Sequence, residues 1–297
     1  MHIDPLKYSR RILRLVVLLV AASLPAAGWG QAQVRLIHPE DGVRHAFEVA
    51  TIKPSADTAA GLQIQLAPSH FSATHASLYD LIKFAYGIKS DEQLAGGPSW
   101  LKTEYFDIQA KASEADIAAW DKLEPRERIT MPRLLVQSLL EDRFQLKVKV
   151  ETHDLPVYAL EVANGGIKMK EVQVDPIPPA GLRPAPGAHL PRIWPSGTNE
   201  FTAKAWPMNE MANWLSFSYE VGNRPVVDET GLKGNYDFVL SGVSQRPPPP
   251  GDANGSSQEP VMSIFSALPE QLGLKLVPEK APTEVLVIQN IEQPSAN

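Results

Sequence analysis

The stretch Arg224-Pro-Val-Val-Asp-Glu-Thr-Gly-Leu-Lys-Gly-Asn-Tyr-Asp-Phe-Val-Leu240 decides how the rest of the chain is interpreted. Its first half is typical of a tight turn, and its second half is typical of a strand. The second half also matches Leu101-Lys-Thr-Glu-Tyr-Phe-Asp-Ile108, because a Leu-Lys pair precedes aromatic residues and an aspartate in both. Two copies of one pattern in one chain indicate an internal repeat.

Other segments match in the same order and at nearly the same spacing. Phe71-Ser-Ala-Thr74 matches Phe201-Thr-Ala-Lys204 at a shift of 130 residues, and Phe144–Val148 matches Leu272–Leu276 at a shift of 128. Each copy predicts a hairpin, a helix, a strand, a second helix and a final hairpin. The expected fold class is therefore α+β, an internally duplicated unit with antiparallel or mixed sheets and helices on one face.

In the first copy, Ser77 is expected to cap a helix with an apolar stripe from Leu78 to Tyr86, and the second helix has Pro132 near its first turn. In the second copy, Pro269 is expected to kink the second helix.

Proline is frequent in this chain, with 27 residues, and its clusters mark the expected boundaries between domains. The predicted parts are a signal peptide at 1–32, a first α+β repeat at 46–172, a proline-rich linker at 173–196, and a second repeat at 197–297 with a proline-rich insertion at 245–260.

Residues 1–32 have the pattern of an export signal. Basic residues precede the apolar run Leu15–Leu24, and small residues follow it, where a signal peptidase cuts. Such a short run does not span the ~30 Å of a bilayer core as an anchor. The Arg10-Arg11 pair leaves the choice between the twin-arginine and the general secretory route open. The mature chain is expected to be periplasmic or extracellular, without a membrane span.

Composition excludes several classes of function. The net charge is −6, and the leader contributes positive charge, so the mature part is acidic and no nucleic-acid partner is expected. The chain has no cysteine, which excludes disulfides, thiolate catalysis and thiolate metal ligands. The histidines have no metal-ligand spacing, and no phosphate-binding loop or dinucleotide fingerprint is present. We therefore expect neither a metal nor a cofactor.

Three aspartates are the candidates for acid–base catalysis. Asp228 lies in Val-Val-Asp-Glu-Thr-Gly, but Glu229 interrupts the resemblance to an aspartic protease motif, and the first copy offers no second aspartate for a dyad. A turn in which Asp228 binds nearby amides is the favoured interpretation. Asp107 and Asp237 occupy equivalent places in the two copies, yet no second functional group lies beside them in the sequence.

Aromatic residues near turns are the candidates for ligand contact. Trp100, Tyr105 and Tyr236 are the residues expected to line a groove if the chain binds a peptide or a glycan. Aromatic residues at such places more often cover the hydrophobic core, and that interpretation is favoured.

Several ordered motifs together resemble a known family. They are Phe-Glu-Val-Ala-Thr-Ile-Lys-Pro-Ser (47–55), Leu-Ala-Gly-Gly-Pro-Ser-Trp-Leu (94–101), Leu-Leu-Glu-Asp-Arg-Phe-Gln-Leu-Lys (139–147), the stretch 224–238, Ser-Ile-Phe-Ser-Ala-Leu (263–268), Glu-Gln-Leu-Gly-Leu-Lys-Leu (270–276) and Ala-Pro-Thr-Glu-Val-Leu-Val-Ile (281–288). From about Ala46 to the C-terminus, the chain is similar to the exported "soil-associated" proteins of unknown function that are expanded in acidobacteria. The resemblance brings no activity, cofactor or catalytic residue. It implies a context, because similar domains form the extracytoplasmic part of membrane metallopeptidase sensors of the β-lactam-response type.

Two functions are therefore expected. The first is an exported, non-enzymatic module that binds a peptide, a glycan or a protein partner, or that acts like a sensor domain. The alternative is a periplasmic hydrolase with an acidic site between the repeats, formed by Asp107, Asp228 or Asp237. Two of these carboxylates in one cleft would favour the hydrolase.

Overall fold

The computed structural model describes most of the chain after its N-terminal segment. The described residues are 33–39, 44–56, 61–67, 69–120, 125–176, 188–243 and 261–294. The predicted signal peptide, the proline-rich insertion and the middle of the predicted linker lie outside them. Residues 32–297 form one compact unit, and the domain boundaries within it stay predictions.

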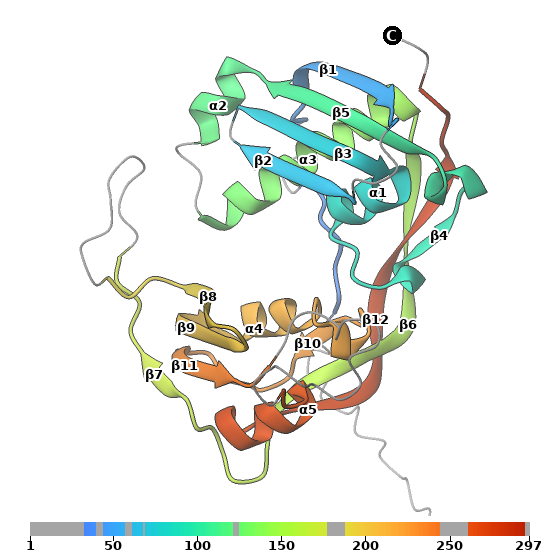
Figure 1. Cartoon of the computed structure of the whole chain (residues 1–297). Helices are drawn as coiled ribbons and strands as arrows, with labels where there is room; N and C mark the ends of the chain where they lie inside the picture. The colour runs from blue at the N-terminus through green and yellow to red at the C-terminus, as the bar shows by residue number, and fades with distance from the viewer. Residues whose placement is uncertain are drawn as a thin grey trace, which may run out of the picture. The chain divides into compact units, whose positions relative to one another are not determined.

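Two four-stranded antiparallel sheets have the same layout (Figure 1). The first sheet has the order β1-β5-β3-β2, and the second has the order β7-β11-β9-β8. The strands of the first are β1 (Phe47–Pro54), β2 (Gln63–Ala67), β3 (His70–Ser77) and β5 (Tyr105–Ala112). The strands of the second are β7 (Lys170–Val172), β8 (Arg192–Gly197), β9 (Glu200–Pro207) and β11 (Asn235–Ser241).

The third sheet joins the two halves of the chain through two long strands. β6 (Lys147–Val162) and β12 (Leu274–Asn290) run antiparallel side by side, as Figure 1 shows. Short parallel strands flank them: β10 (Val226–Asp228) pairs with β6, and β4 (Leu94–Gly96) pairs with β12. Each half therefore contributes a short strand to the long strand of the other half.

The final hairpin predicted for each copy is wrong, because β6 and β12 are single strands. Pro156, Pro278 and Pro282 lie inside the ladder, where the sequence suggested turns. Proline is tolerated in a strand whose nitrogen faces an open side. The prolines lie outside the segments that β10 and β4 cover, so their missing N–H groups take no bond from these two pairings. At Pro282, Val34 lies beside the strand and donates its backbone N–H to the proline carbonyl oxygen.

Residues 78–86 and 208–215 form helices that each bury one apolar stripe. The helix bounds are α1 (Leu78–Tyr86), α2 (Glu114–Trp120), α3 (Pro125–Phe144), α4 (Met208–Leu215) and α5 (Ile264–Ala267), with 3₁₀ turns η1 (Asp91–Gln93), η2 (Ser99–Lys102) and η3 (Tyr219–Val221) and a π-helical turn η4 (Leu268–Leu272). α1 begins after Ser77, whose hydroxyl accepts the backbone N–H of Asp80, and it ends at Gly87 with φ 69°.

Two helices differ from their predicted form. α3 was expected to begin near Pro132, but it begins at Pro125, so Pro132 lies inside the helix. Proline is well suited to the first turn, and Pro125 takes that place, while Pro132 costs α3 one backbone hydrogen bond. The helix expected around Pro269 divides into the short α5 and the turn η4, in line with the kink predicted there.

Alternating burial places the helices on one face of the first sheet. Phe106, Ile108 and Ala110 of β5 are buried, whereas Tyr105 on the same strand is 37% exposed. The buried face packs against α1 and α3 in one core, and a second core lies between α4, α5 and the second sheet. The α+β class with antiparallel and mixed sheets is confirmed, while the internal duplication stays a prediction. None of the helices in the described part of the chain is long and apolar enough for a membrane span.

Candidate functional site

Asp107 and Asp237 have the same task in the two antiparallel sheets. The strand before each helix is irregular at a non-glycine residue with positive φ, which is His75 (49°) in β3 and Ala205 (47°) in β9. The backbone N–H of His75 donates to Asp107 at 2.9 Å, and that of Ala205 donates to Asp237 at 2.8 Å. A bulge takes an N–H out of the ladder, and each carboxylate supplies the lost acceptor. Both aspartates therefore stabilise a bend in a strand.

Asp237 is additionally surrounded by positive charge. Lys204 Nζ donates to its Oδ2 at 2.7 Å, and His189 Nε2 lies 3.6 Å from the same oxygen. Burial alone raises the pKa of this carboxyl, but the hydrogen bonds from Lys204 and the Ala205 N–H outweigh burial, so the pKa of Asp237 lies below its usual range. An ionised, fully bonded carboxylate is a poor proton donor at neutral pH.

Asp228 forms the turn that the sequence predicts. It accepts the backbone N–H of Thr230 at 3.0 Å and the Thr230 hydroxyl at 2.7 Å, and Gly231 has φ 69°. Each of the three aspartates has its own partners, and no hydrogen bond joins two of them in the described residues. The described part of the chain also contains no group of three or more acidic or histidine side chains that could hold a metal ion.

The three aromatic candidates do not line one groove. Tyr236 is 2% exposed and belongs to the second core, so its side chain is closed to a ligand. Trp100 packs against the first core. Tyr105 is exposed, but its ring stacks on His75 with the centroids 4.1 Å apart. The prediction that such residues cover a core describes Trp100 and Tyr236.

A cavity of about 200 Å³ lies at the C-terminal end of α1. Residues from three segments line it: Lys83, Phe84, Gly87 and Ile88 from α1 and the residues after it, Arg133 from α3, and Phe217 from the segment after α4. The cavity thus combines aromatic surfaces with basic side chains. A concave, partly apolar site with a few polar groups is the common form of a small-molecule site.

Arg133 contributes a fixed positive charge to this cavity. Its Nη1 donates to the carbonyl oxygen of Phe84 at 2.7 Å, and its guanidinium lies 4.9 Å from the centroid of the Phe84 ring. Burial lowers the pKa of Arg133, although an arginine stays charged at any physiological pH. Only one of its five N–H donors is used in this bond, so others remain for a ligand.

Lys89 adds a second cation beside the cavity. Its Nζ lies 3.7 Å from the centroid of the Phe217 ring and donates to Asn213 Oδ1 at 2.7 Å. Burial, and to a lesser extent the nearby charge of Arg133, lower the pKa of Lys89 to about 7, while Glu210 acts in the opposite direction. Neither Lys89 nor Arg133 forms an ion pair with a carboxylate among the described residues. Unbalanced cations in one partly buried place are typical of functional sites.

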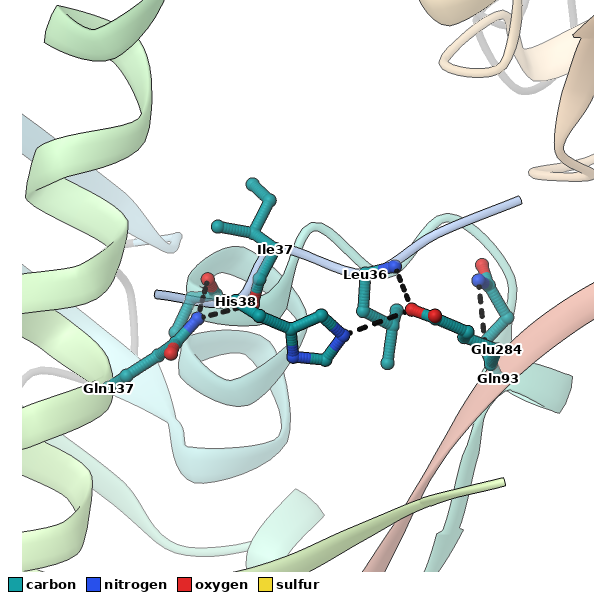
Figure 2. Close-up of polar contacts among 7 residues, drawn as sticks. Leu36, Ile37, His38, Gln93, Gln137 and Glu284 are labelled. Atoms are coloured by element: carbon teal, nitrogen blue, oxygen red, sulfur yellow. Dashed lines mark hydrogen bonds and ion pairs between the residues drawn. The ribbon is translucent and has the colours of Figure 1, made fainter. Parts of the chain in front are cut away.

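The N-terminal segment is held by side chains from α3 and β12 (Figure 2). Gln137 Nε2 donates to the carbonyl oxygens of Ile37 and Ala85 at 2.8 and 3.0 Å, and a Cβ on Gly87 would lie 3.0 Å from Ile37 Cδ1. A glycine at 87 therefore allows the segment to lie against the end of α1.

A carboxylate on β12 anchors the same segment, as Figure 2 also shows. Glu284 accepts the backbone N–H of Leu36 at 2.7 Å, and its Oε2 lies 3.0 Å from His38 Nε2. Gln93, fully buried, donates to the carbonyl oxygen of Glu284 and accepts the backbone N–H of Lys89. One continuous hydrogen-bond network thus connects the N-terminal segment with the backbone of Lys89.

No sequence motif predicted this cavity. Phe84, Arg133 and Phe217 are far apart in the sequence, and each follows a pattern that looks purely structural. The one local signal is Gly87, which ends α1 and opens space for a neighbour. The two cations carry no motif, so only their three-dimensional arrangement distinguishes them from ordinary surface charges.

The comparisons with known proteins name a family without an activity. A family model described as "Protein of unknown function (DUF3738)" matches residues 79–291, which include all of the described strands except β1, β2 and β3. No curated protein matches the chain, and no solved structure matches it.

Proposed function

We propose a function from the structure of this chain, which belongs to the DUF3738 family of proteins of unknown function. The chain is an exported, non-enzymatic binding module, and the cavity lined by Phe84, Arg133 and Phe217 is its ligand site. A sensor-like role is part of the proposal, in agreement with the resemblance to the extracytoplasmic domains of membrane sensors.

The observation that carries the proposal is the combination of two unbalanced cations with two aromatic rings at one cavity. Arg133 lies on Phe84, Lys89 lies on Phe217, and both rings line the cavity. A fold alone does not require half-buried cations without carboxylate partners, because each carries a desolvation cost. An anionic ligand would offset this cost by balancing the charge of the two side chains.

Binding is favoured over hydrolysis by what the aspartates do. Asp107 and Asp237 each hold a strand irregularity, and Asp228 forms a turn. These bonds engage the carboxylates with their own backbone. The cavity, in contrast, offers donors that are not engaged by a carboxylate.

The test is a screen of small compounds by two-dimensional ¹H–¹⁵N spectra of the purified chain. We expect hits whose shift changes centre on Gly87, Ile88 and Phe217, and we expect Phe217→Ala to abolish them. Phe265→Ala is the matched control, since Phe265 is also a partly exposed phenylalanine, but its ring packs on Tyr158 away from the lining of the cavity. Hits that map elsewhere, or that survive Phe217→Ala, would overturn the assignment of the site.

Export is tested separately by cell fractionation and by mass spectrometry of the N-terminus. The pattern of residues 1–32 supports an exported chain that begins near Gln33. An Arg10→Lys, Arg11→Lys double variant distinguishes the two routes, because only twin-arginine export depends on the pair. A full-length chain that stays in the cytoplasm would contradict export.

A further inference from the structure

We infer that the ligand of this cavity is a compact carboxylate attached to a flat apolar body of about one ring. The inference rests on the proposed function, because it names the ligand class of the same site. It follows from three properties of the site, which are its charge, the geometry of its donors and its size.

The charge of the site favours an anion. Arg133 lies close enough to Lys89 to disfavour its charge, and the described residues provide neither cation with a carboxylate partner. The other basic residue of the cavity, Lys83, is different, because its Nζ lies 2.6 Å from Asp91 Oδ1. Glu210 on α4 favours the charged form of Lys89 only from a distance. A bound anion would balance both free cations at once.

The donors favour a carboxylate in particular. One Arg133 nitrogen is fixed by the Phe84 carbonyl at 2.7 Å, which holds the plane of the guanidinium in place. A planar guanidinium binds a planar carboxylate through two parallel N–H bonds, and a fixed orientation lowers the entropy lost on binding. Lys89 adds a compact positive charge, with its Nζ 3.7 Å from the centroid of the Phe217 ring that lines the cavity.

The walls and the volume set the rest of the ligand. Phe84 and Phe217 present ring surfaces, and Gly87 and Ile88 complete a lining that is more apolar than polar. The cavity has about 200 Å³. A cavity of about 150 Å³ is known to hold a benzene ring. There is room for one ring and a carboxylate, and a drug-sized compound would not fit inside.

Two sources supply this chemistry, namely a free aromatic acid and the C-terminal carboxylate of a peptide that ends in an aromatic residue. Phenylacetate represents the first source and N-acetylphenylalanine the second. The amide of each compound has the same shape without the charge. Titration calorimetry of the purified chain with all four compounds therefore separates the carboxylate from the ring, and the free acid from the peptide end.

We expect at least one acid to bind, and its amide to bind about 10- to 100-fold more weakly, as is typical when a charged hydrogen-bond partner is lost. Arg133→Gln and Lys89→Met should each weaken binding of the acid and leave the affinity for the amide unchanged. The matched controls are Arg192→Gln, since Arg192 also lies on an aromatic ring (Trp194, 4.6 Å), and Lys233→Met, since Lys233 is exposed. Neither control should change the affinity.

If an acid and its amide bind equally well, the claim that the ligand is a carboxylate would be wrong. The site would then be an apolar ligand site, and the proposed function would stand without this inference. If none of the four compounds binds and the compound screen gives no hits at Gly87 and Phe217, both this inference and the proposed function would be overturned. The matched acid and amide on the unmodified chain keep the test valid even if Arg133→Gln does not fold.

Discussion

The segments that follow α1 and α4 begin from the same arrangement and end differently. Both helices follow a strand whose positive-φ residue is held by an aspartate. α1 then ends at Gly87, whereas α4 ends in a right-handed conformation at Ser216 and continues to Phe217, which is 53% exposed. Gly87 and Phe217 are separated by the same 130 residues as β3 and β9, and both line the cavity.

This difference separates scaffold from site. The aspartates and positive-φ residues occur in both halves, so they serve the fold in both. The cations and the opposed glycine and phenylalanine occur once, at the one place where the two helix ends meet. In a chain with two similar halves, the features that the halves do not share are therefore the better candidates for function.

The largest loss of stability is expected from a substitution at Gly273. Gly273 directly follows η4, just as Gln145 directly follows α3. Both residues have positive φ, 70° and 51°. A Cβ on Gly273 would clash with the carbonyl oxygen of Gly166, so Gly273→Ala forces the backbone apart and should cost more than about 3 kcal/mol in urea unfolding. Gln145→Gly is the counterpart and should be neutral or stabilising by about 1 kcal/mol, since it relieves left-handed strain. If Gly273→Ala leaves the stability unchanged, the predicted difference between positions 273 and 145 would be wrong.

Replacing Asp237 should destabilise the chain more than replacing Asp107. Asp237→Ala should cost about 2–3 kcal/mol and Asp107→Ala about 1–2 kcal/mol, because both leave a backbone N–H without its acceptor and Asp237 also loses charged partners. Chemical unfolding at pH 7 measures both. Equal costs would show that Lys204 and His189 contribute nothing.

The difference between these variants should also depend on pH. The pKa of Asp237 is lowered in the folded chain, so the unfolded chain binds the proton more tightly. Its contribution to stability is present above the unfolded pKa of about 3.9 and is lost as pH falls through the folded pKa. The stability gap between the unmodified chain and Asp237→Asn should therefore close in acid. A gap that stays constant to pH 3 would refute the ionised carboxylate.

A smaller loss of stability is expected when the hydrogen bonds between the N-terminal segment and β12 are removed. Glu284→Ala removes the acceptor of the Leu36 N–H and the partner of His38, and it should cost about 1–2 kcal/mol. Hydrogen exchange should become faster at Leu36 and Ile37. Slow exchange in the variant would indicate that packing of Leu36, which is 5% exposed, holds the segment without Glu284.

The smallest stability effect should come from Phe217→Ala. More than half of this side chain is exposed, so its removal should change the unfolding free energy by less than about 1 kcal/mol. The same variant should lose ligand binding. A large loss of stability would instead make Phe217 a structural residue.

The sequence predicted local features well and long-range pairing poorly. The Ser77 cap, the α1 stripe and the turn at Asp228 depend on residues within one or two turns of chain, and all appear as expected. The two long strands could not be predicted, because Pro156 and Pro282 look like turn residues until the partner strand is known. Pairing across more than a hundred residues leaves no local signal.

The cavity could not be predicted for the same reason. Arg133 lies on a helix and Lys89 lies just after a helix cap, positions where basic residues are common. Their meaning depends on which rings they contact and on the absence of a carboxylate partner among the described residues. The attention given to Asp107, Asp228 and Asp237 came from motif similarity, and their partners are local backbone and turn groups.

The most direct measurement of the central claim is the number of protons taken up when phenylacetate binds at pH 8. It is obtained by titration calorimetry in two buffers with different protonation enthalpies. The free chain has Lys89 with a pKa of about 7, so most Lys89 side chains are neutral at pH 8, and a carboxylate bound beside Lys89 raises that pKa. Arg133 does not titrate here. Glu210 on α4 is the carboxylate that favours the charged form of Lys89 in the free chain. We predict net proton uptake in the unmodified chain and none in Lys89→Met. Binding without proton uptake, or with equal uptake in both chains, would contradict a carboxylate held between Arg133 and Lys89.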